Sequence, residues 1–528
     1  MIRAVLAGSV GLTGCLTLAG GLAGCSGSDD PFEPGPGTDT EDPGAGVAFV
    51  GAIALSANPN PDAPLAVHLV AETDRPATLA VSVEASGRTW GWDLPEGTVH
   101  DRWLDRWRAG EVHHVTVTAT AADGSTATST LDWTAATAPA ELSGWTVTSA
   151  DPAATEPGIT VFPISEIQGD AWLVGVDVDG ALVYAQHHDL PIREFERLST
   201  GNVAVIADED GLYEFSPDGA IVAEWHPGLH VPPGAGGVVL DGMGSLHHDF
   251  GELPDGSLYA LSVDLRTVDG YPTSETDPDA PRVTAQVVGQ SVVTFTRDGA
   301  VTQTLNLLDV LDPTRIAYDA VVSRYWEEYF TPSVQPRDWG HANAVLYDPT
   351  DDTFVVGLRH QDVLVKLSRA TGEVVWILAP PANWTPALEA LRLQPADGGS
   401  FAWLYHQHGP EYGPDGTLFV LDNHNHGASA YEPEPPSVET RAVELRIDDA
   451  ARTVSEIWSY GDGLGLYAST QGNVQPLPET DHVLVVFGAL TGGARLVETT
   501  HTTPATEVWR LDLPLPSGTS VFRAKRWD

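Results

Sequence analysis

Short segments in which apolar and polar residues alternate run through most of the chain and end at turn-forming residues. Between residues 47 and 137 the clearest of them cover 65–70, 77–83 and 115–119, and Asp123 and Gly124 mark one of the turns. A period of two is typical of strands with one buried face. Val, Thr, Tyr and Trp are spread among 53 Gly and 40 Pro, which favours many short strands over long helices. The sequence therefore predicts an all-β protein.

The strands expected over residues 47–140 predict a small first domain. Their spacing resembles that of an immunoglobulin-like or fibronectin type III β-sandwich. We expect this domain to be a spacer or docking module. With 528 residues, the chain has room for a second and larger domain.

A unit made of two recurring patterns fills the chain from about residue 158 onward. One pattern is a turn that leads into a strand, as in 198–206, 253–259, 413–419 and 477–484. The other is a hairpin turn, as in 177–181, 216–220, 296–300 and 368–373. Four strands and two hairpin turns per unit are the pattern of a propeller blade. Counting the units predicts a β-propeller of about six blades over 150–528, with insertions at 308–338 and 379–404.

The first 25 residues have the layout of a secretory signal, with an apolar, Gly-rich stretch that ends in small residues before Cys25. Residues 22–25 resemble a lipoprotein processing box, in which Cys25 is lipidated. We therefore expect an exported periplasmic or cell-surface lipoprotein, with 26–46 as a disordered linker. The alternative is a protein cleaved near Ala23 and released without a lipid.

The net charge of −47 excludes several classes of partner. A chain this acidic repels nucleic acid and anionic lipid. We therefore expect no nucleic acid partner, and we expect the protein to contact a membrane only through its lipid anchor. Both cysteines, Cys15 and Cys25, lie in the leader. If Cys25 is lipidated, the mature chain has no disulfide, no Cys-ligated metal and no Cys nucleophile.

Three histidines occupy the same place in successive units when the units are aligned on their turns. They are His248, His341 and His408, each seven residues before a turn Asp, and Arg193 holds that place in an earlier unit. Because the first strand of every blade lines the central channel, we expect these side chains to converge. Arg359 and Asn423 follow second strands that return to the same end of the channel.

This set of side chains suits one kind of chemistry. Imidazoles, a guanidinium and amide donors can bind a tetrahedral oxyanion while one imidazole attacks as a nucleophile. Phosphoryl and sulfuryl groups both fit. The structural alternative is that each histidine merely holds its turn by a hydrogen bond, which is the commoner role of a single histidine.

The motifs around these residues resemble the bacterial arylsulfotransferase family. The resemblance rests on residues 247–249, 338–343, 357–362 with 371–376, and 406–408 with 421–423. It implies transfer of a sulfuryl group from an aryl sulfate to a phenol through a sulfohistidine, without a nucleotide donor or any other cofactor. By motif, His408 is the nucleophile, and His248, His341 and Arg359 complete the catalytic set. Asn343, Thr470 and Asn423 are the implied substrate-binding residues.

Several features near these motifs leave alternatives open. His406 lies two residues before His408, so either could be the nucleophile. The sequence at 187–189 copies the His-His-Asp motif but misses the turn register, which favours a structural role. His424 and His426 form a second shell or, less favoured, a metal pair, and we expect no metal at the site.

The insertions bring aromatic residues that either stack on a phenolic substrate or only pack the insertions onto the propeller. They are Tyr325, Trp326, Tyr329, Phe330, Trp384 and Trp403. Two other functions remain: a non-catalytic propeller that binds ligands or partners at the cell surface, and a metal-dependent hydrolase. The phosphate-binding pattern of nucleotide-dependent enzymes is lacking, since neither Lys366 nor Lys525 follows a glycine. Whether the protein forms a homodimer is left open.

Overall fold

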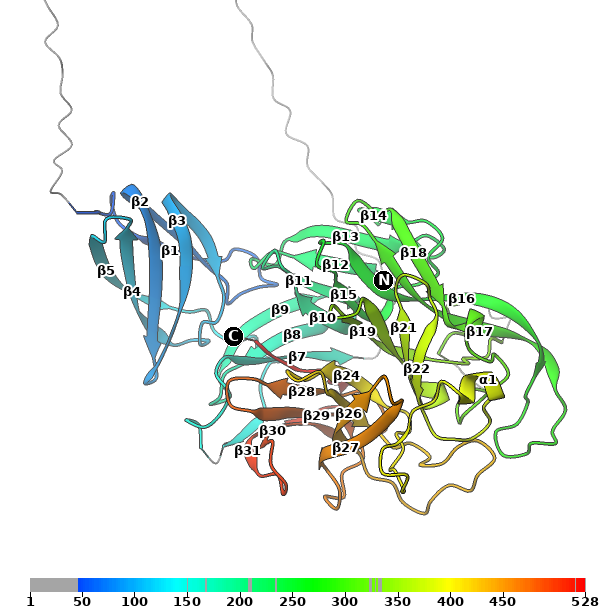
Figure 1. Cartoon of the computed structure of the whole chain (residues 1–528). Helices are drawn as coiled ribbons and strands as arrows, with labels where there is room; N and C mark the ends of the chain where they lie inside the picture. Colours follow the sequence, from blue (N-terminus) through cyan, green and yellow to red (C-terminus); the bar gives the residue numbers. More distant parts are fainter. Residues whose placement is uncertain are drawn as a thin grey trace, which may run out of the picture. The chain divides into compact units, whose positions relative to one another are not determined.

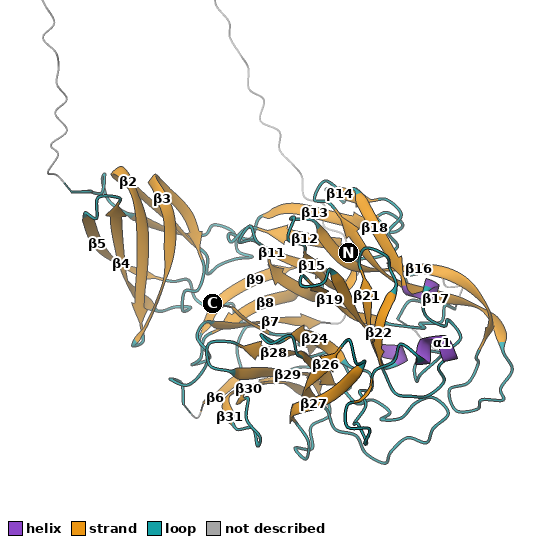
Figure 2. Ribbon diagram, in the orientation of Figure 1, coloured by secondary structure: helices purple, strands orange, loops and turns teal. Residues whose placement is uncertain are grey.

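The structure is a computed structural model that describes residues 46–149, 151–166, 169–207, 211–232, 235–321, 325–327, 329–330, 335–517 and 519–527. The leader with Cys25 and the linker up to residue 45 lie outside these residues. From Val47 onward the chain forms one compact unit (Figure 1). Strands dominate it, which confirms the all-β prediction (Figure 2). None of the helices in the described part of the chain is long and apolar enough to cross a membrane.

The first domain contains five strands around a core of alternating residues. Its long hairpin of β2 and β3 supplies alternate buried positions such as Leu69, Val81 and Val83. β1 pairs with the first half of β2 and β4 with the second half, while β3 pairs with both. Breaks in register between Glu72 and Leu79 separate the two halves. The strands are β1 (Ala54–Ala57), β2 (Val67–Ala85), β3 (Arg88–Leu104), β4 (Val112–Ala121) and β5 (Thr126–Thr134).

The strands described after the first domain form six sheets, the number of units that the sequence predicts. Most successive strands within a sheet pair antiparallel, whereas β14 (Val238–Leu240) and β23 (Gln394–Pro395) each add to a sheet as a parallel strand. The first three sheets in chain order contain β7 (Ile159–Glu166), β8 (Ala171–Val176) and β9 (Leu182–His188); β10 (Ile192–Arg197), β11 (Val203–Ala207), β12 (Gly211–Phe215), β13 (Ile221–Pro227) and β14 (Val238–Leu240); and β15 (His247–Glu252), β16 (Leu258–Tyr271), β17 (Val283–Phe295) and β18 (Val301–Asn306).

The last three sheets follow the same plan. They contain β19 (Ala342–Asp348), β20 (Thr353–Leu358), β21 (Val363–Ser368) and β22 (Val374–Leu378); β23 (Gln394–Pro395), β24 (His408–Tyr412), β25 (Leu418–Asp422), β26 (Arg441–Asp448) and β27 (Thr453–Tyr460); and β28 (Val474–Leu477), β29 (His482–Leu490), β30 (Gly493–Thr500) and β31 (Glu507–Pro514). The described helices are one turn each: η1 (Leu307–Asp309), η2 (Arg359–Gln361) and α1 (Pro386–Glu389).

The two ends of this region close the ring of sheets. β6 (Thr146–Ser149) pairs with β31, so the chain just before residue 150 already belongs to the last sheet. β33 (Lys525–Trp527) and β32 (Thr519–Ser520) pair with β7 in the first sheet. A strand from the start of this region thus completes the last sheet, and strands from its C-terminal end complete the first sheet, as in a β-propeller.

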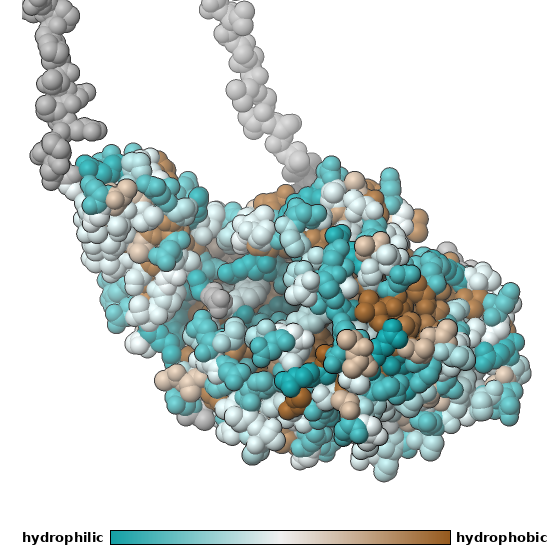
Figure 3. Space-filling model, in the orientation of Figure 1, coloured by the Kyte–Doolittle hydropathy of each residue, from teal (hydrophilic) through white to brown (hydrophobic). Residues whose placement is uncertain are grey.

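The innermost strands surround a central channel. β10, β15, β19, β24, β28 and β33 contact one another in that order. The circle closes where Lys525 of β33 donates from Nζ to the backbone carbonyl of Phe195 in β10, at 3.0 Å. Apolar residues fill the spaces between neighbouring sheets, for example Val356, Leu358 and Val365. Hydrophilic side chains cover much of the face drawn in Figure 3, in agreement with the 73 Asp and Glu residues of the chain.

Candidate active site

The predicted ring histidines lie where the innermost strands begin. His248 is the second residue of β15, His341 directly precedes β19, and His408 begins β24. The imidazole centroids of His248 and His341 are 5.0 Å apart. His408 interacts electrostatically with both of these histidines and with Arg359. The structure therefore brings together His248, His341, His408 and Arg359, as the turn register predicts.

Breaks in strand pairing occur at the positions of these histidines. The register shifts between His247 and Phe250, between Ala342 and Ala344, and between His408 and Glu411. β10 has the same irregularity at Arg193, which lies within electrostatic range of His248. Extra residues of this kind bend a strand and redirect its side chains.

The backbone is strained at the same positions. The φ angles of His248, His341 and His406 are 56°, 44° and 55°, in the left-handed region that residues with a Cβ rarely adopt. Each such residue costs about 1–3 kcal/mol and persists only where its surroundings fix it. Clustering of strain at three neighbouring histidines is a feature of functional sites rather than of ordinary turns.

His408 has a defined proton position. Its Nδ1 lies 2.8 Å from Oδ1 of Asn423. Nδ2 of Asn423 donates to the carbonyls of Ala468 and Gln471 at 2.8 and 3.1 Å, which fixes the amide with its oxygen toward the imidazole. Nδ1 of His408 must therefore carry the hydrogen, and Nε2 keeps its lone pair.

The surroundings of His408 also keep it neutral. Burial lowers the pKa of His408 well below its ordinary value, and the positive charge of Arg359 acts in the same direction. Burial lowers the pKa of His248 in the same way. At neutral pH the site therefore offers unprotonated imidazoles beside a buried guanidinium.

His341 and Arg359 are held by residues that the ring alignment did not assign. Asp338 Oδ2 lies 2.5 Å from Nδ1 of His341 and holds the proton on that nitrogen. Although burial opposes ionisation, His341 and His360 keep the pKa of Asp338 at about 2. His360 stacks on His341, and its Nε2 accepts from Arg359 Nη1 at 2.7 Å. Asp338 and His360 lie within residues 338–343 and 357–362, so the resemblance of these segments to the family could have pointed to both residues.

Two of the three predicted substrate-binding residues, Asn423 and Asn343, contact His408 or the residue before it. Asn423 uses its whole amide to orient His408 and its neighbours, so the structure gives it a positioning role. Asn343 is fully buried and donates from Nδ2 to the carbonyl of Gln407 at 2.7 Å, which ties β19 to the segment carrying His408. Thr470 is half-buried and precedes Gln471. Among the contacts of the described residues, none joins Thr470 to the histidines.

His406 differs from His408 in its partners. Nδ1 of His406 lies 3.0 Å from Oδ1 of Asp362, and its Nε2 lies 3.4 Å from Oδ2 of Asp319. Both ring nitrogens thus face carboxylates. With a carboxylate at each nitrogen, His406 is less suited than His408 to act as a free nucleophile. The geometry favours His408 between the two alternatives.

Phe522 and Tyr325 complete the walls around the histidines. The Phe522 ring lies 5.8 Å from that of His248 and 6.4 Å from that of His408. Tyr325, from the first insertion, lies 5.4 Å from His248 and 5.0 Å from His341. Tyr325 is therefore the insertion residue placed to meet an aromatic ligand. No sequence pattern pointed to Phe522.

The other insertion aromatics mostly pack within the protein. Trp326 is buried against His247, at 5.2 Å between ring centroids. The guanidinium of Arg315 lies 3.9 Å from the ring centroid of Trp384, and that of Arg392 lies 5.3 Å from Trp403. Trp326 thus packs the first insertion onto the propeller, Trp384 joins the two insertions, and Trp403 packs within the second insertion.

The His-His-Asp copy at 187–189 lies at the end of β9, the strand farthest from the channel in its sheet, with Asp189 just beyond the strand. His188 is buried with its ring 4.6 Å from Phe215, and His187 packs on Trp172 at 5.0 Å. His424 lies 3.0 Å from Asp422 through Nδ1 and Oδ2. These histidines have structural partners.

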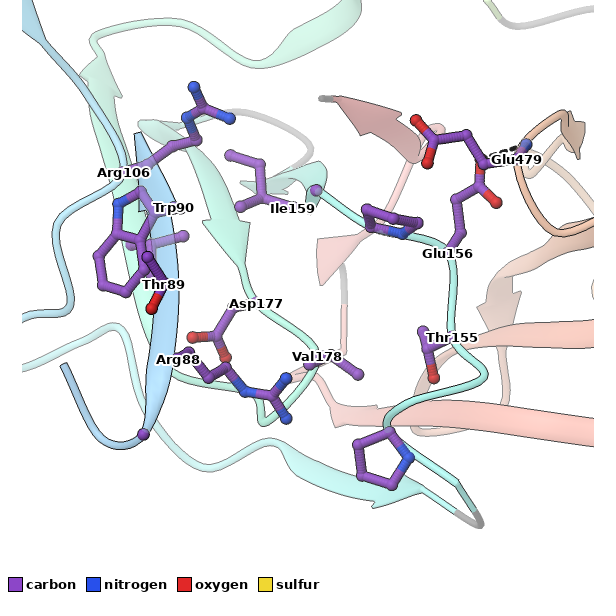
Figure 4. A pocket seen from close by; sticks show the side chains of 15 residues that line it. Arg88, Thr89, Trp90, Arg106, Thr155, Glu156, Ile159, Asp177, Val178 and Glu479 are labelled. Atoms are coloured by element: carbon purple, nitrogen blue, oxygen red, sulfur yellow. Dashed lines mark hydrogen bonds between the residues drawn. The ribbon is translucent and has the colours of Figure 1, made fainter. Parts of the chain in front are cut away.

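Two groups near the site have the geometry to hold a metal ion: Asp319, His406 and His426, and Asp338, His341 and His360. A third group, Asp170, His187 and Asp189, is more exposed. The pocket in Figure 4 is a different feature, lined among others by Arg88, Trp90 and Asp177. Glu156 there accepts from the backbone nitrogen of Glu479 at 3.1 Å. No histidine is among the described residues that line it.

Comparison with known proteins finds relatives of parts of the chain. Two curated arylsulfate sulfotransferases, AssT, match parts of the chain. That of Escherichia coli O6:H1 (strain CFT073) is 34% identical over 145 residues, or 24% of each chain. That of Lelliottia amnigena is 30% identical over 172 residues, or 29% of this chain and 28% of its own. The matched part thus spans about a quarter of each relative.

Likeness to solved structures is weak. Hydrazine synthase of Kuenenia stuttgartiensis is 9% identical with a TM-score of 0.33, covering 74% of this chain and 93% of its own, which is too low to carry an argument. The family model described as Arylsulfotransferase (ASST) matches residues 145–516, which include the whole histidine cluster and most of the ring of sheets. The chain belongs to the arylsulfotransferase family.

Proposed function

We propose that the protein transfers a sulfuryl group from an aryl sulfate to a phenol in two steps, with His408 as the covalent carrier and no nucleotide donor. Family membership supports the reaction class. The observation that supports His408 as the carrier is its contact with Asn423 through Nδ1. This contact leaves the lone pair of Nε2 free, beside Arg359.

In the first step, Nε2 of His408 attacks the sulfur of the aryl sulfate. An N–S bond forms, the bond between sulfur and the phenolic oxygen breaks, and the phenolate leaves with its electron pair. Negative charge on the sulfuryl oxygens and the departing oxygen is stabilised by the guanidinium of Arg359. Asn423 stabilises the proton on Nδ1 while the ring becomes positively charged.

In the second step, the oxygen of an acceptor phenol attacks the same sulfur. The N–S bond breaks and returns its electron pair to Nε2 of His408. The phenolic proton passes to an unprotonated imidazole, for which the low pKa of His248 provides a candidate. Tyr325 gives each aromatic ring a surface to pack against at the mouth of the cluster.

The test is a burst experiment with an aryl sulfate whose phenolate is coloured. Without acceptor, the protein should release about one phenolate per chain and then stall, and addition of a phenol should restart release. His114→Gln is the control variant and should give the same burst as the wild type, because His114 lies in the first domain with 68% of its side chain exposed. Continuous release without acceptor would indicate a hydrolase, and no release would indicate a binding protein.

We also propose that the protein is exported and lipidated at Cys25, which the leader sequence alone supports. Metabolic labelling with a fatty acid should mark the wild-type protein and not Cys25→Ser. Labelling of both proteins to the same extent would refute the assignment of Cys25.

A further inference from the structure

Asp319, His406 and His426 meet at the edge of the candidate active site. Asp319 comes from the insertion between β18 and β19, His406 from the segment before β24, and His426 from the loop between β25 and β26. Nε2 of His406 lies 3.4 Å from Oδ2 of Asp319, and Nε2 of His426 lies 3.8 Å from Oδ1. One nitrogen or oxygen atom from each residue lies within 4.8 Å of the others.

Each imidazole in this group is oriented by a carboxylate on its opposite nitrogen. Nδ1 of His406 lies 3.0 Å from Asp362 Oδ1, which also accepts from the backbone nitrogen of His406 at 2.9 Å. Nδ1 of His426 lies 2.9 Å from Glu434 Oε2. A carboxylate behind the non-ligating nitrogen is the usual way in which proteins orient metal-binding histidines. Both Nε2 atoms are thereby aimed at Asp319.

The burial of His406 gives a second indication of a ligand. His406 is 1% exposed, and the 3.4 Å contact of its Nε2 with Asp319 does not have the geometry of a hydrogen bond. A buried polar atom without a hydrogen bond is costly and uncommon. The φ angles of Asp319, His406 and His426 are 67°, 55° and 61°, so all three residues adopt left-handed backbone to reach this point.

We propose that Asp319, His406 and His426 form a binding site for a divalent transition-metal ion such as zinc. Two imidazoles and one carboxylate are a common set of zinc ligands, and they leave a fourth position for water or another ligand. The ion would join the insertion to the two loops that flank His408 and Asn423. The proposal does not depend on sulfuryl transfer, and it goes beyond the sequence-based expectation of no metal.

The neighbouring group of Asp338, His341 and His360 is a weaker candidate. Nδ1 of His360 lies 2.9 Å from the carbonyl of Asp338, and its Nε2 accepts from Arg359. Both nitrogens of that ring therefore have partners already. His424, which the sequence paired with His426 as a candidate ligand, is instead hydrogen-bonded to Asp422.

The experiment measures zinc binding by calorimetry on purified protein that has been stripped with a chelator. All proteins carry His187→Ala, which removes the more exposed group of Asp170, His187 and Asp189. We expect one equivalent of zinc per chain, with affinity lowered at least tenfold by Asp319→Asn and by His426→Ala. His424→Ala is the matched control from the same loop and should bind as the parent does.

Cobalt and thermal unfolding give two further readings. Cobalt bound by the parent, which carries only His187→Ala, should give the visible absorption of a four-coordinate site. His426→Ala should lose this absorption. Zinc should raise the melting temperature of the parent and of His424→Ala, but not that of Asp319→Asn. His426 has 27% of its side chain exposed, so its truncation leaves the core intact. Lack of stoichiometric binding by the parent, or unchanged affinity in both Asp319→Asn and His426→Ala, would overturn the proposal.

Discussion

Asn423 holds the Nδ1 hydrogen of His408 through a 2.8 Å contact to its Oδ1, and its own Nδ2 is held by two backbone carbonyls. The amide cannot rotate to offer a donor without breaking both of those bonds. His408 is therefore restricted to the tautomer with a free lone pair on Nε2. His406, only two residues away, has carboxylates at both nitrogens. One hydrogen bond thus distinguishes two histidines that the sequence left as alternatives.

The first prediction concerns His408, the residue proposed to carry the sulfuryl group. His408→Ala should abolish the phenolate burst and lower turnover by at least about a thousandfold, because it removes the imidazole whose Nε2 is proposed to attack sulfur. His406→Gln should keep a burst of about one phenolate per chain. Peptide mass spectrometry after the burst should find an acid-labile adduct on His408. An adduct on His406 would reverse the assignment.

The second prediction tests the role of Asn423. Asn423→Asp places a negative charge against Nδ1 of His408, which stabilises the protonated imidazole and raises its pKa. Since the proposed attack on sulfur needs neutral His408, the acid limb of the pH–activity profile should move to higher pH. Asn425→Asp adds a carboxylate to the same loop, where the side chain contacts Tyr467 instead. A profile that moves equally in both variants would show a general charge effect.

The third prediction separates the charge of Arg359 from its shape. Arg359→Lys keeps the positive charge but loses the planar pair of donors, so turnover should fall by about a hundredfold with little change in the acid limb. Arg359→Gln removes the charge that helps to lower the pKa of His408, so its acid limb should move to higher pH. Near-normal activity of Arg359→Lys would mean that the guanidinium does not bind the sulfuryl oxygens.

The ring of sheets and the convergence of its histidines could be predicted because both depend on local patterns. Alternation gives the strands, and turn residues such as Asp255, Asp348 and Asp415 give the register. Once inner strands begin at one end of a channel, His248, His341 and His408 have to meet there.

Contacts between distant segments could not be predicted in this way. Asp319 lies in an insertion without a repeating pattern, and Phe522 comes from the C-terminal segment that reaches the channel only after the ring closes. The role of Asn423 also depends on two carbonyls some fifty positions further along the chain, Ala468 and Gln471. Such partners are set by tertiary packing.

The fourth prediction concerns acid stability and uses His188, a buried histidine away from the site. Burial lowers its pKa to about 3, whereas an unfolded histidine titrates near 6.5. Between these values the unfolded state binds the proton and the folded state does not, so stability falls as the pH drops below about 6.5. His188→Leu removes this contribution of His188 to the pH dependence of stability. The loss of unfolding free energy between pH 7 and pH 5 should be smaller in the variant by about 2 kcal/mol.

Urea titrations of both proteins at the two pH values measure that difference, whatever the absolute effect of the substitution. The buried carboxyls titrate in both proteins alike, so their contributions cancel. An equal acid loss in the two proteins would show that His188 is protonated in the folded state.

The last prediction concerns the closure of the ring by Arg526 in β33. Its Nε donates to Oγ1 of Thr160 in the first sheet at 3.1 Å, and its Nη2 lies 3.0 Å from Oε2 of Glu498 in the last sheet. Both Arg526 and Glu498 are buried. Arg526→Ala leaves a buried carboxylate without its cation, which should lower the free energy of unfolding by about 3–5 kcal/mol. Arg495 is the matched control, since its pair with Asp512 is about one-third exposed, and Arg495→Ala should cost under about 1 kcal/mol. Equal and small losses in urea unfolding would mean that backbone pairing of β33 closes the ring without help from this ion pair.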